Sequence, residues 1–288
     1  MSTRFYSLRG NVTIMEVGIV ARKGNPDAAA VADRIREGVE ARGETVWIDE
    51  RTAAALDNEA GRDVTALAAC DLAVAVGGDG TFLFAARNAG GTPVLGVNLG
   101  EVGFLNVVNP DDAEAAVLAA VEEFHADGIR VREMPRLAAR TAGWESTPAV
   151  NEVVVQGTRR GPGGGIEYAL SVDGARYSGG HADGVLVATP TGSTAYNLSE
   201  DGPLVHPDVG GLIVNEMAPA EGMPPLAVNV DATITVAVDD PDGAVVVSDG
   251  RNAKAVTGPV EVAIERTEPP VRIAGPESEF FEALDKLS

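Results

Sequence analysis

A glycine-rich turn presents a single carboxylate at residues 76–81, which read Val-Gly-Gly-Asp-Gly-Thr. The turn follows the apolar run Leu72–Val76 and precedes the helical run Phe82–Asn88, so we expect it at the carboxyl end of a buried strand. Its glycines leave backbone N–H groups open to an approaching phosphate. Because a carboxylate repels phosphate, Asp79 is predicted to be a general base toward a hydroxyl or a ligand of Mg²⁺. A plain turn is the alternative that the spacing leaves open.

A second glycine-rich segment, Gly96–Phe104, follows the next predicted strand, Val94–Val97. The carboxyl ends of neighbouring parallel strands meet at one sheet edge, so this segment is expected beside the first. Asn98 and Phe104 are its candidate contact residues. Close packing of a strand-to-helix turn would explain the glycines equally well.

The third segment begins with Asp183-Gly184 and continues through an apolar run to Thr189–Tyr196, which reads Thr-Pro-Thr-Gly-Ser-Thr-Ala-Tyr. Hydroxyl groups directly before the short helical run Ala195–Leu198 offer donors to an anion, and one aromatic face is available for a base or a ribose. A capping loop of turn formers would explain Ser193 but not the density of hydroxyls.

Several common sites are excluded or weakened by what the chain lacks. It contains no G-x-x-x-x-G-K-[ST] phosphate loop, and no G-x-G-x-x-G follows the first predicted strand. Three histidines and the single Cys70 do not suffice for a zinc cluster. Hydrolase chemistry at Ser193 is disfavoured, because no Gly-x-Ser-x-Gly elbow surrounds it.

Taken together, these segments resemble the NAD kinase family, whose members use ATP or polyphosphate. The resemblance covers roughly residues 14–260 in the family's order of motifs. The Gly-Gly-Asp-Gly turn alone is shared with lipid kinases and phosphofructokinases, whereas Asn151-Glu152 and the 189–196 segment make the match specific. The segments that match are 77–81, 96–105, 151–152, 183–184, 189–196, Ser199 and 202–203.

The resemblance implies that Asp79 takes the proton of the 2′-hydroxyl on the adenosine ribose of NAD, while a phosphoryl group from ATP or polyphosphate moves to that oxygen. Mg²⁺ or another divalent cation would neutralise charge. Asn151 and Glu152 would hold NAD hydroxyls, and Asp183 the nicotinamide end. The other expected nucleotide contacts are Gly78, Gly80, Thr81, Asn98, Phe104, His181, Thr191, Thr194, Ala195, Tyr196, Ser199 and Arg251.

One departure from the family keeps two alternatives open. Residues 217–228 lack a His and an Arg that the family usually shows there. A non-catalytic NAD(P)-sensing module that lost donor binding is therefore one alternative. A lipid or sugar kinase sharing the Gly-Gly-Asp-Gly turn is the other, although residues 151–152 and 189–196 count against it.

The elements that must position these residues fall into two regions. Short apolar runs alternate with helical segments over residues 1–130, where Asn25-Pro26 and Asn109-Pro110 each predict a helix start. We therefore expect an α/β domain with a doubly wound, mostly parallel sheet. Strand-like runs between turn residues, among them Leu137–Thr141 and Val260–Arg266, predict a β-rich NAD-binding domain over 131–275. A helical tail is expected over 276–288.

Composition limits the partners. The chain has 43 acidic residues against 22 lysines and arginines, a formal net charge of −21 over 288 residues. A dispersed negative charge disfavours binding to nucleic acid or anionic membranes, and it suggests a protein from a salt-accumulating organism. No run approaches the ~18 apolar residues of a membrane span, so we expect a cytoplasmic protein. Exposed strand edges and the family resemblance suggest a homodimer or homotetramer.

Overall fold

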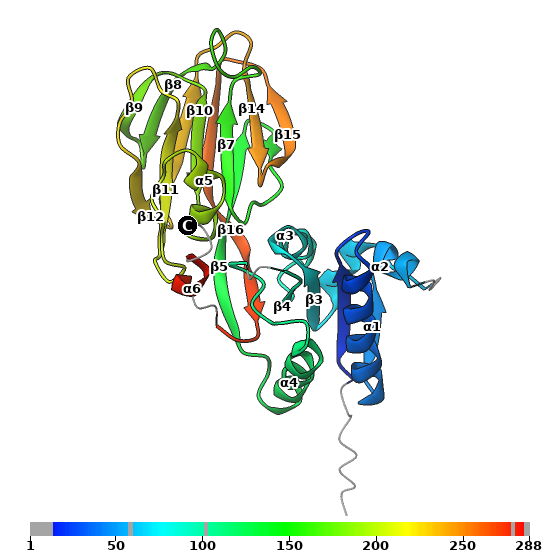
Figure 1. The fold of residues 1–288 in the computed structure, drawn as a ribbon. Helices are drawn as coiled ribbons and strands as arrows, with labels where there is room; N and C mark the ends of the chain where they lie inside the picture. The colour runs from blue at the N-terminus through cyan, green and yellow to red at the C-terminus, as the bar shows by residue number, and fades with distance from the viewer. Residues whose placement is uncertain (1–13, 57–59, 101–102, 278–279, 285–288) are drawn as a thin grey trace, which may run out of the picture.

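Two structural regions share one long pair of strands. The computed structural model describes residues 14–56, 60–100, 103–277 and 280–284. Figure 1 shows an α/β part in blue to cyan and a strand-rich part in green to orange, with β5 (Val131–Thr141) and β16 (Val260–Ala274) running from one to the other. This confirms the predicted combination of an α/β N-terminal region and a β-rich C-terminal region.

Four parallel strands form the sheet of the α/β part, in the order β2, β1, β3, β4. They are short apolar runs, and all of β3 and β4 is buried, as expected for a parallel sheet covered on both faces. Their bounds are β1 (Glu16–Ala21), β2 (Thr45–Ile48), β3 (Leu72–Gly77) and β4 (Val94–Asn98).

Helices cover both faces of this sheet. The side chains of α1 (Pro26–Ala41) and α4 (Ala113–Ala126) share one core with the strands. Those of η1 (Val64–Ala69) and α3 (Asp79–Asn88) share a second core on the opposite face. The sheet is therefore doubly wound, as predicted. A further short helix, α2 (Glu50–Ala55), follows β2.

The two predicted helix starts had different outcomes. Asn25 caps α1 as expected, because its Oδ1 accepts a hydrogen bond from the N–H of Ala28 (3.0 Å), with proline in the first turn. The start predicted at Asn109-Pro110 was wrong, since α4 begins at Ala113. Residues 109–112 form a separate turn instead, in which the N–H of Asp112 donates to the carbonyl of Asn109 (3.1 Å).

The strand β16 is the physical link between the regions. Ile264 pairs with Ile234 of the strand-rich part, whereas Ile273 pairs with Val94 of β4. The sequence indicated only residues 260–266 of this strand, which contains Pro269 and Pro270 further on. In the structure these prolines coincide with an irregularity in the β5–β16 pairing between Thr267 and Val271, and the strand then continues.

The strand-rich part is a sandwich of two sheets. One is the continuation of the ten-stranded sheet, and the other has the order β12, β11, β10, β7, β14, β15. Apolar side chains from both sheets form its core. Its remaining strands and helices are β6 (Trp144–Glu145), β7 (Glu152–Gln156), β8 (Ile166–Val172), β9 (Ala175–Ala182), β10 (Gly184–Ala188), η2 (Thr191–Thr194), α5 (Tyr196–Ser199), β11 (Gly211–Met217), β12 (Leu226–Asn229), β13 (Ile234–Val238), β14 (Ala244–Ser248) and β15 (Arg251–Val256).

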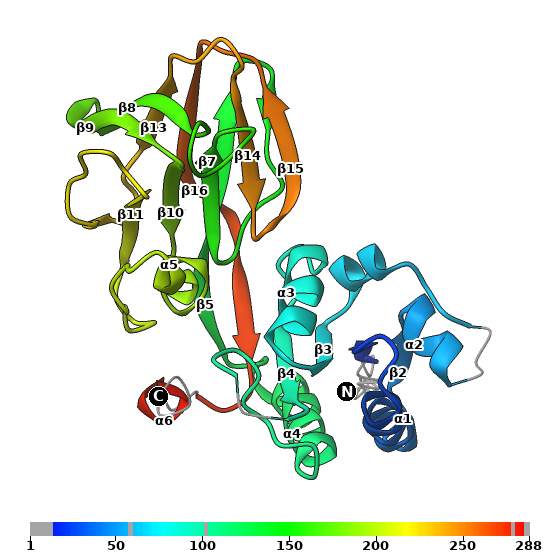
Figure 2. The ribbon, with the colours of Figure 1, turned by 45° about the horizontal axis from the view of Figure 1, so that its top comes forward.

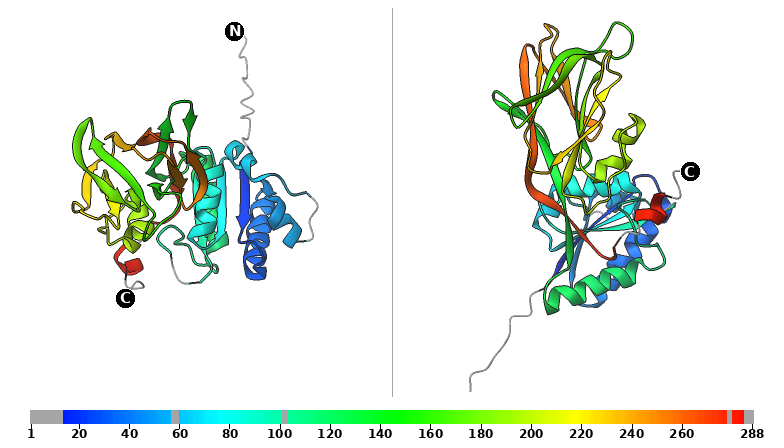
Figure 3. Two further views of the ribbon diagram at one scale, coloured as in Figure 1. Left: turned by 90° about the horizontal axis from the view of Figure 1, so that it is seen from above. Right: turned by 90° about the vertical axis from the view of Figure 1, so that its left-hand side faces the viewer.

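A short C-terminal helix, α6 (Phe280–Leu284), lies outside both sheets and is red in Figure 3. The ring of Phe280 is 5.9 Å from that of Phe104 and 5.1 Å from that of His206. Part of the predicted tail helix, residues 278–279 and 285–288, lies outside the described residues. Within the described ranges, no helix has the length and apolar character needed to cross a bilayer.

Candidate active site

Asp79 is the first residue of α3 and follows the buried strand β3 through Gly78. Its half-buried carboxylate accepts hydrogen bonds from the N–H groups of Phe104 (3.1 Å), Leu105 (3.3 Å) and Asn106 (3.4 Å). No ion pair involves it among the described residues. A carboxylate has about four lone-pair sites, so three amides orient this one and leave acceptor capacity for a ligand.

The loop that holds Asp79 follows β4 and is itself fastened to the glycine-rich turn. Asn106 is fully buried, and its Nδ2 donates to the carbonyl of Gly77 (3.2 Å). Its Oδ1 has no hydrogen-bond partner. The sequence analysis did not single out Asn106. The predicted contact residue Asn98 is the last residue of β4, and its Nδ2 donates to the carbonyl of Gly100 in this loop (3.0 Å).

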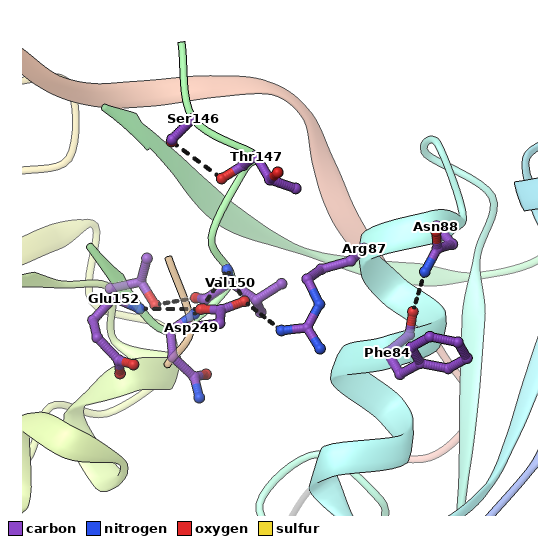
Figure 4. Close-up of polar contacts among 10 residues, drawn as sticks. Phe84, Arg87, Asn88, Ser146, Thr147, Val150, Glu152 and Asp249 are labelled. Carbon is purple, nitrogen blue, oxygen red and sulfur yellow. Dashed lines mark hydrogen bonds and ion pairs between the residues drawn. The ribbon is translucent and has the colours of Figure 1, made fainter. Parts of the chain in front are cut away.

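The Asn151-Glu152 turn is organised by a residue that is distant in the sequence and follows β14, as Figure 4 shows. The carboxylate of Asp249 accepts hydrogen bonds from the N–H groups of Val150 (3.0 Å), Asn151 (2.8 Å) and Glu152 (3.3 Å). Arg87 of α3 lies 3.3 Å from the same carboxylate. Of the segment 249–251 the sequence analysis named only Arg251, because the partners of Asp249 are far away in the chain.

The same turn holds polar atoms without partners. Asn151 Oδ1 and Glu152 Oε2 are buried and form no hydrogen bond within the described structure. Burial raises the pKa of the Glu152 carboxyl to about 7, and repulsion from Asp249 adds to the effect, while the N–H of Tyr196 opposes it. Unsatisfied buried polar atoms are costly, so this arrangement is suited to a ligand that supplies hydroxyl groups.

The hydroxyl-rich segment packs directly on this turn. The N–H of Thr189 donates to the carbonyl of Asn151 (2.9 Å), and its Oγ1 donates to that of Val150 (2.7 Å). A side chain at Gly192 would lie 2.9 Å from Cα of Asn151, so the approach requires glycine. Ser193 is buried and bonded to Pro190 and Val205, which gives it a structural role.

The predicted residues of the hydroxyl-rich segment lie in or between η2 and α5, next to the Asn151-Glu152 turn. Thr191 has a buried Oγ1 without a partner, and Thr194 Oγ1 donates to the carbonyl of Thr191 (3.3 Å). Ala195 leads into α5, which begins at Tyr196 and ends at the exposed Ser199. The hydroxyl of Tyr196 accepts a hydrogen bond from Arg160 (2.7 Å).

Asp183 and His181 both contact the glycine-rich loop 161–165. The carboxylate of Asp183 accepts from the N–H of Gly161 (2.9 Å). The two ring nitrogens of the exposed His181 lie 3.2 Å from Glu167 Oε1 and 2.8 Å from the carbonyl of Gly164. Both nitrogens of His181 are thus occupied by protein groups, and no described contact joins it to the Asn151-Glu152 turn.

A cationic cleft of about 420 Å³ opens at the other side of the glycine-rich turn. Gly78, Gly80 and Thr81 line it together with Asp49, whose carboxylate is engaged as the cap of α2. The basic side chains around it are Arg22, Lys23, Arg51 and Arg251. None of these four forms an ion pair within the described residues. Arg51 is placed over the ring of Phe84, 5.5 Å from its centroid.

Sequence analysis predicted only Arg251 of these cations. The signal for two others was present, since Arg22-Lys23 directly follows β1 at the ligand-binding edge of the sheet. Residues 217–228, which lack the family's His and Arg, form the end of β11, a loop and the start of β12. The cleft therefore draws its positive charge from other elements.

Comparison with protein-family models matches residues 17–125 to the ATP-NAD kinase N-terminal domain and residues 150–274 to the ATP-NAD kinase C-terminal domain. The chain belongs to the NAD kinase family. The predicted resemblance is thereby confirmed, and as a member of this family the chain is a phosphotransferase. Neither alternative, the non-catalytic module or the lipid or sugar kinase, finds support among the comparisons.

Relatives match over nearly the whole chain. An NAD kinase of Halorubrum lacusprofundi is 66% identical over 275 residues, which cover 95% of this chain and 100% of the relative. An NAD kinase of Halobacterium salinarum is 54% identical over 281 residues, with coverages of 95% and 100%.

Solved NAD kinase structures have the same fold. The NAD kinase from Archaeoglobus fulgidus in complex with ATP superimposes with a TM-score of 0.77 at 29% identity, covering 95% of this chain and 98% of that one. Yeast NADH kinase complexed with NADH gives a TM-score of 0.82 at 20% identity, covering 95% and 87%, and shows the fold alone.

Proposed function

We propose that this chain transfers the γ-phosphoryl group of ATP to the 2′-hydroxyl of the adenosine ribose of NAD, giving NADP and ADP. The observation that carries the proposal is the placement of Asp79. Its carboxylate is oriented by three backbone amides, is free of ion pairs within the described residues, and stands at the turn that lines the cationic cleft. Family membership supplies the phosphotransferase activity.

The acceptor side of the site is the Asn151-Glu152 turn. The buried, unpartnered Asn151 Oδ1 and Glu152 Oε2 are acceptors suited to the hydroxyls of a ribose. Asp183 would bind the nicotinamide end, and the residues Thr191, Thr194, Ala195, Tyr196 and Ser199 would line the same dinucleotide site. Relatives that are 66% and 54% identical to this chain are NAD kinases, which supports a dinucleotide site here.

The chemical step requires one proton acceptor and good positioning. Asp79 takes the proton of the 2′-hydroxyl as that oxygen forms a bond to the γ-phosphorus, and the bond from phosphorus to the bridging oxygen of ADP breaks. The hydrogen bonds from residues 104–106 fix the carboxylate, so it needs no rearrangement before reaction.

The donor side is the cationic cleft. Arg22, Lys23, Arg51 and Arg251 offer unpaired positive charge to the phosphates of ATP, and the N–H groups at the start of α3 add to it. A relative solved with ATP supports this donor. Polyphosphate is the alternative donor, because the same charges would bind its phosphates.

Mg²⁺ fits this site as part of the donor substrate. Within the described part of the chain, no three His, Cys, Asp or Glu side chains gather into a metal site. In phosphoryl-transfer enzymes Mg²⁺ is commonly held by one or two carboxylates together with the phosphates of the substrate. We therefore propose that Mg²⁺ enters with ATP and neutralises charge on its phosphates.

Two further expectations remain proposals: a cytoplasmic location, and a homodimer or homotetramer. A high-salt environment is proposed as well, since the chain carries a net charge of −21 and its relatives include proteins of Halorubrum and Halobacterium.

Incubation of the purified chain with NAD, Mg²⁺ and either ATP or polyphosphate tests the function. The expected product carries a new phosphate on the 2′-oxygen of the adenosine ribose, seen by mass spectrometry and ³¹P NMR. A sugar or lipid phosphorylated in preference to NAD, or NAD bound without turnover, would contradict the proposal.

A further inference from the structure

We propose that the buried ion pair between Arg87 and Asp249 is a positioning device, which sets the acceptor-binding turn in register with the helix that carries Asp79. This proposal rests on the proposed function. Arg87 lies in the last turn of α3, and Asp249 follows β14 of the sandwich. The pair therefore joins the α/β part to the strand-rich part. Figure 4 shows the two side chains, and Figure 2 shows α3 in the first part and β14 in the second.

Asp249 is buried, and both its carboxylate and its backbone N–H have partners within the protein. Its side chain is 1% exposed and that of Arg87 is 10% exposed. Besides Arg87, the carboxylate accepts the three consecutive amides of residues 150–152, and its own N–H donates to the carbonyl of Glu152 (3.0 Å). Its φ of 50° lies in the left-handed region, which aspartate tolerates better than most residues.

Two other charged groups face Asp249. Arg136 is buried, and burial lowers the pKa of its guanidinium, an effect that Asp249 and Glu268 partly offset. Arg136 is held by the carbonyl of Pro269 (2.7 Å), whereas Arg87 reaches Asp249 directly. Glu152 is the nearby carboxyl whose pKa Asp249 helps to raise. Arg87 is therefore the cation that a substitution can remove without disturbing the β16 backbone.

The pair acts at a distance from the chemistry. Arg87 follows Asp79 by eight positions in the sequence, which is about 12 Å along a helix. The carboxylate of Asp249 is 1% exposed and is occupied by Arg87 and by the N–H groups of residues 150–152. We therefore assign the pair to positioning of the acceptor turn rather than to the chemical step. The turn that contains Asp249 continues to Arg251, which lines the cationic cleft. One short segment, residues 249–251, thus contacts the acceptor turn at one end and the donor cleft at the other. Misplacement by about 1 Å can cost about 100-fold in rate.

Steady-state kinetics of Arg87→Met, Asp249→Asn, the double variant and Arg87→Lys test the proposal. We expect kcat to fall at least 10-fold in each single variant, while KM for ATP stays within about 3-fold. Because the two side chains act as one unit, the double variant should be little worse than the worse single variant. Arg87→Lys, which keeps the charge, should recover part of kcat. Arg272→Met removes an exposed ion pair with Glu133 and serves as the control with unchanged kcat.

A readout independent of activity separates this proposal from the proposed function. Hydrogen exchange of the amides at 150–152 should accelerate at least 10-fold in Arg87→Met but not in Arg272→Met. If the wild-type chain forms no NADP, the proposed function fails and the exchange still decides the role of the pair. The positioning role would be overturned by any of three results. These are unchanged hydrogen exchange at residues 150–152 in Arg87→Met, losses in kcat that multiply in the double variant, and no recovery of kcat in Arg87→Lys.

Discussion

The carboxylate of Asp79 lies directly against Gly103, so that a methyl group at residue 103 would stand 2.6 Å from Cγ of Asp79. Gly103 thereby allows the following amides, those of residues 104–106, to reach the carboxylate. We predict that Gly103→Ala displaces either the loop or the carboxylate and lowers kcat by about 10-fold or more, with a smaller effect on the free energy of unfolding.

The matched control for this substitution is Gly210→Ala. Gly210 has open space around the added methyl group. The kcat and the thermal unfolding midpoint of the Gly210→Ala variant should equal those of the wild type. If Gly103→Ala retained the wild-type kcat, the loop would not position Asp79 in the way described.

Glu152 makes stability depend on pH. Its folded pKa of about 7 lies above the ordinary value of 4.5, so the folded chain binds the proton more tightly than the unfolded chain. The free energy of unfolding should therefore fall as pH rises from about 4.5 to about 7, by about 3 kcal/mol at ~1.4 kcal/mol per pKa unit, and then level off.

Urea unfolding of the wild type and Glu152→Gln at a series of pH values, in constant salt, measures this effect. The Gln variant lacks the titrating group, so its stability relative to the wild type should increase between pH 5 and pH 8. A stability difference independent of pH would show that the carboxyl has an ordinary pKa.

The cationic cleft predicts a selective effect on the donor. Arg51→Gln removes one unpaired charge from the cleft, so KM for ATP should rise about 3- to 10-fold, more at low salt than at high salt. KM for NAD should stay within 2-fold. Arg42→Gln, which removes an exposed cation of a different face, is the control. Equal increases in both KM values would argue against a donor role for the cleft.

Salt should stabilise the folded chain. With a net charge of −21, repulsion between carboxylates is screened over about 10 Å at 0.1 M salt and about 3 Å at 1 M. The thermal unfolding midpoint should rise as KCl increases from 0.1 to 3 M. If the midpoint in dilute buffer equalled that in 3 M KCl, the proposed adaptation to high salt would be wrong.

The sequence predicted the parts of the site that local chemistry determines. The glycine-rich turn at Asp79, the Asn151-Glu152 pair and the hydroxyl-rich segment stand out because unusual residue types lie close together in the chain. The parallel strands were also predictable, since short apolar runs between breakers are typical of a covered sheet.

What the sequence did not predict depends on long-range contacts. Asp249 binds amides 97 to 99 residues away and a side chain 162 residues away, and no local pattern reports such distances. Likewise, the sequence indicated this strand only over residues 260–266, although pairing with β5 continues β16 to Ala274, in the α/β part. The placement of α6 against Phe104 was undetermined for the same reason.

The base role of Asp79 is the central claim, and Asp79→Asn tests it most directly. Single-turnover formation of NADP from saturating NAD and ATP, with the Kd for NAD measured by calorimetry, separates chemistry from binding. We predict a rate lower by about 100-fold or more with a Kd for NAD within a few-fold of the wild type. A rate equal to that of the wild type would contradict the account.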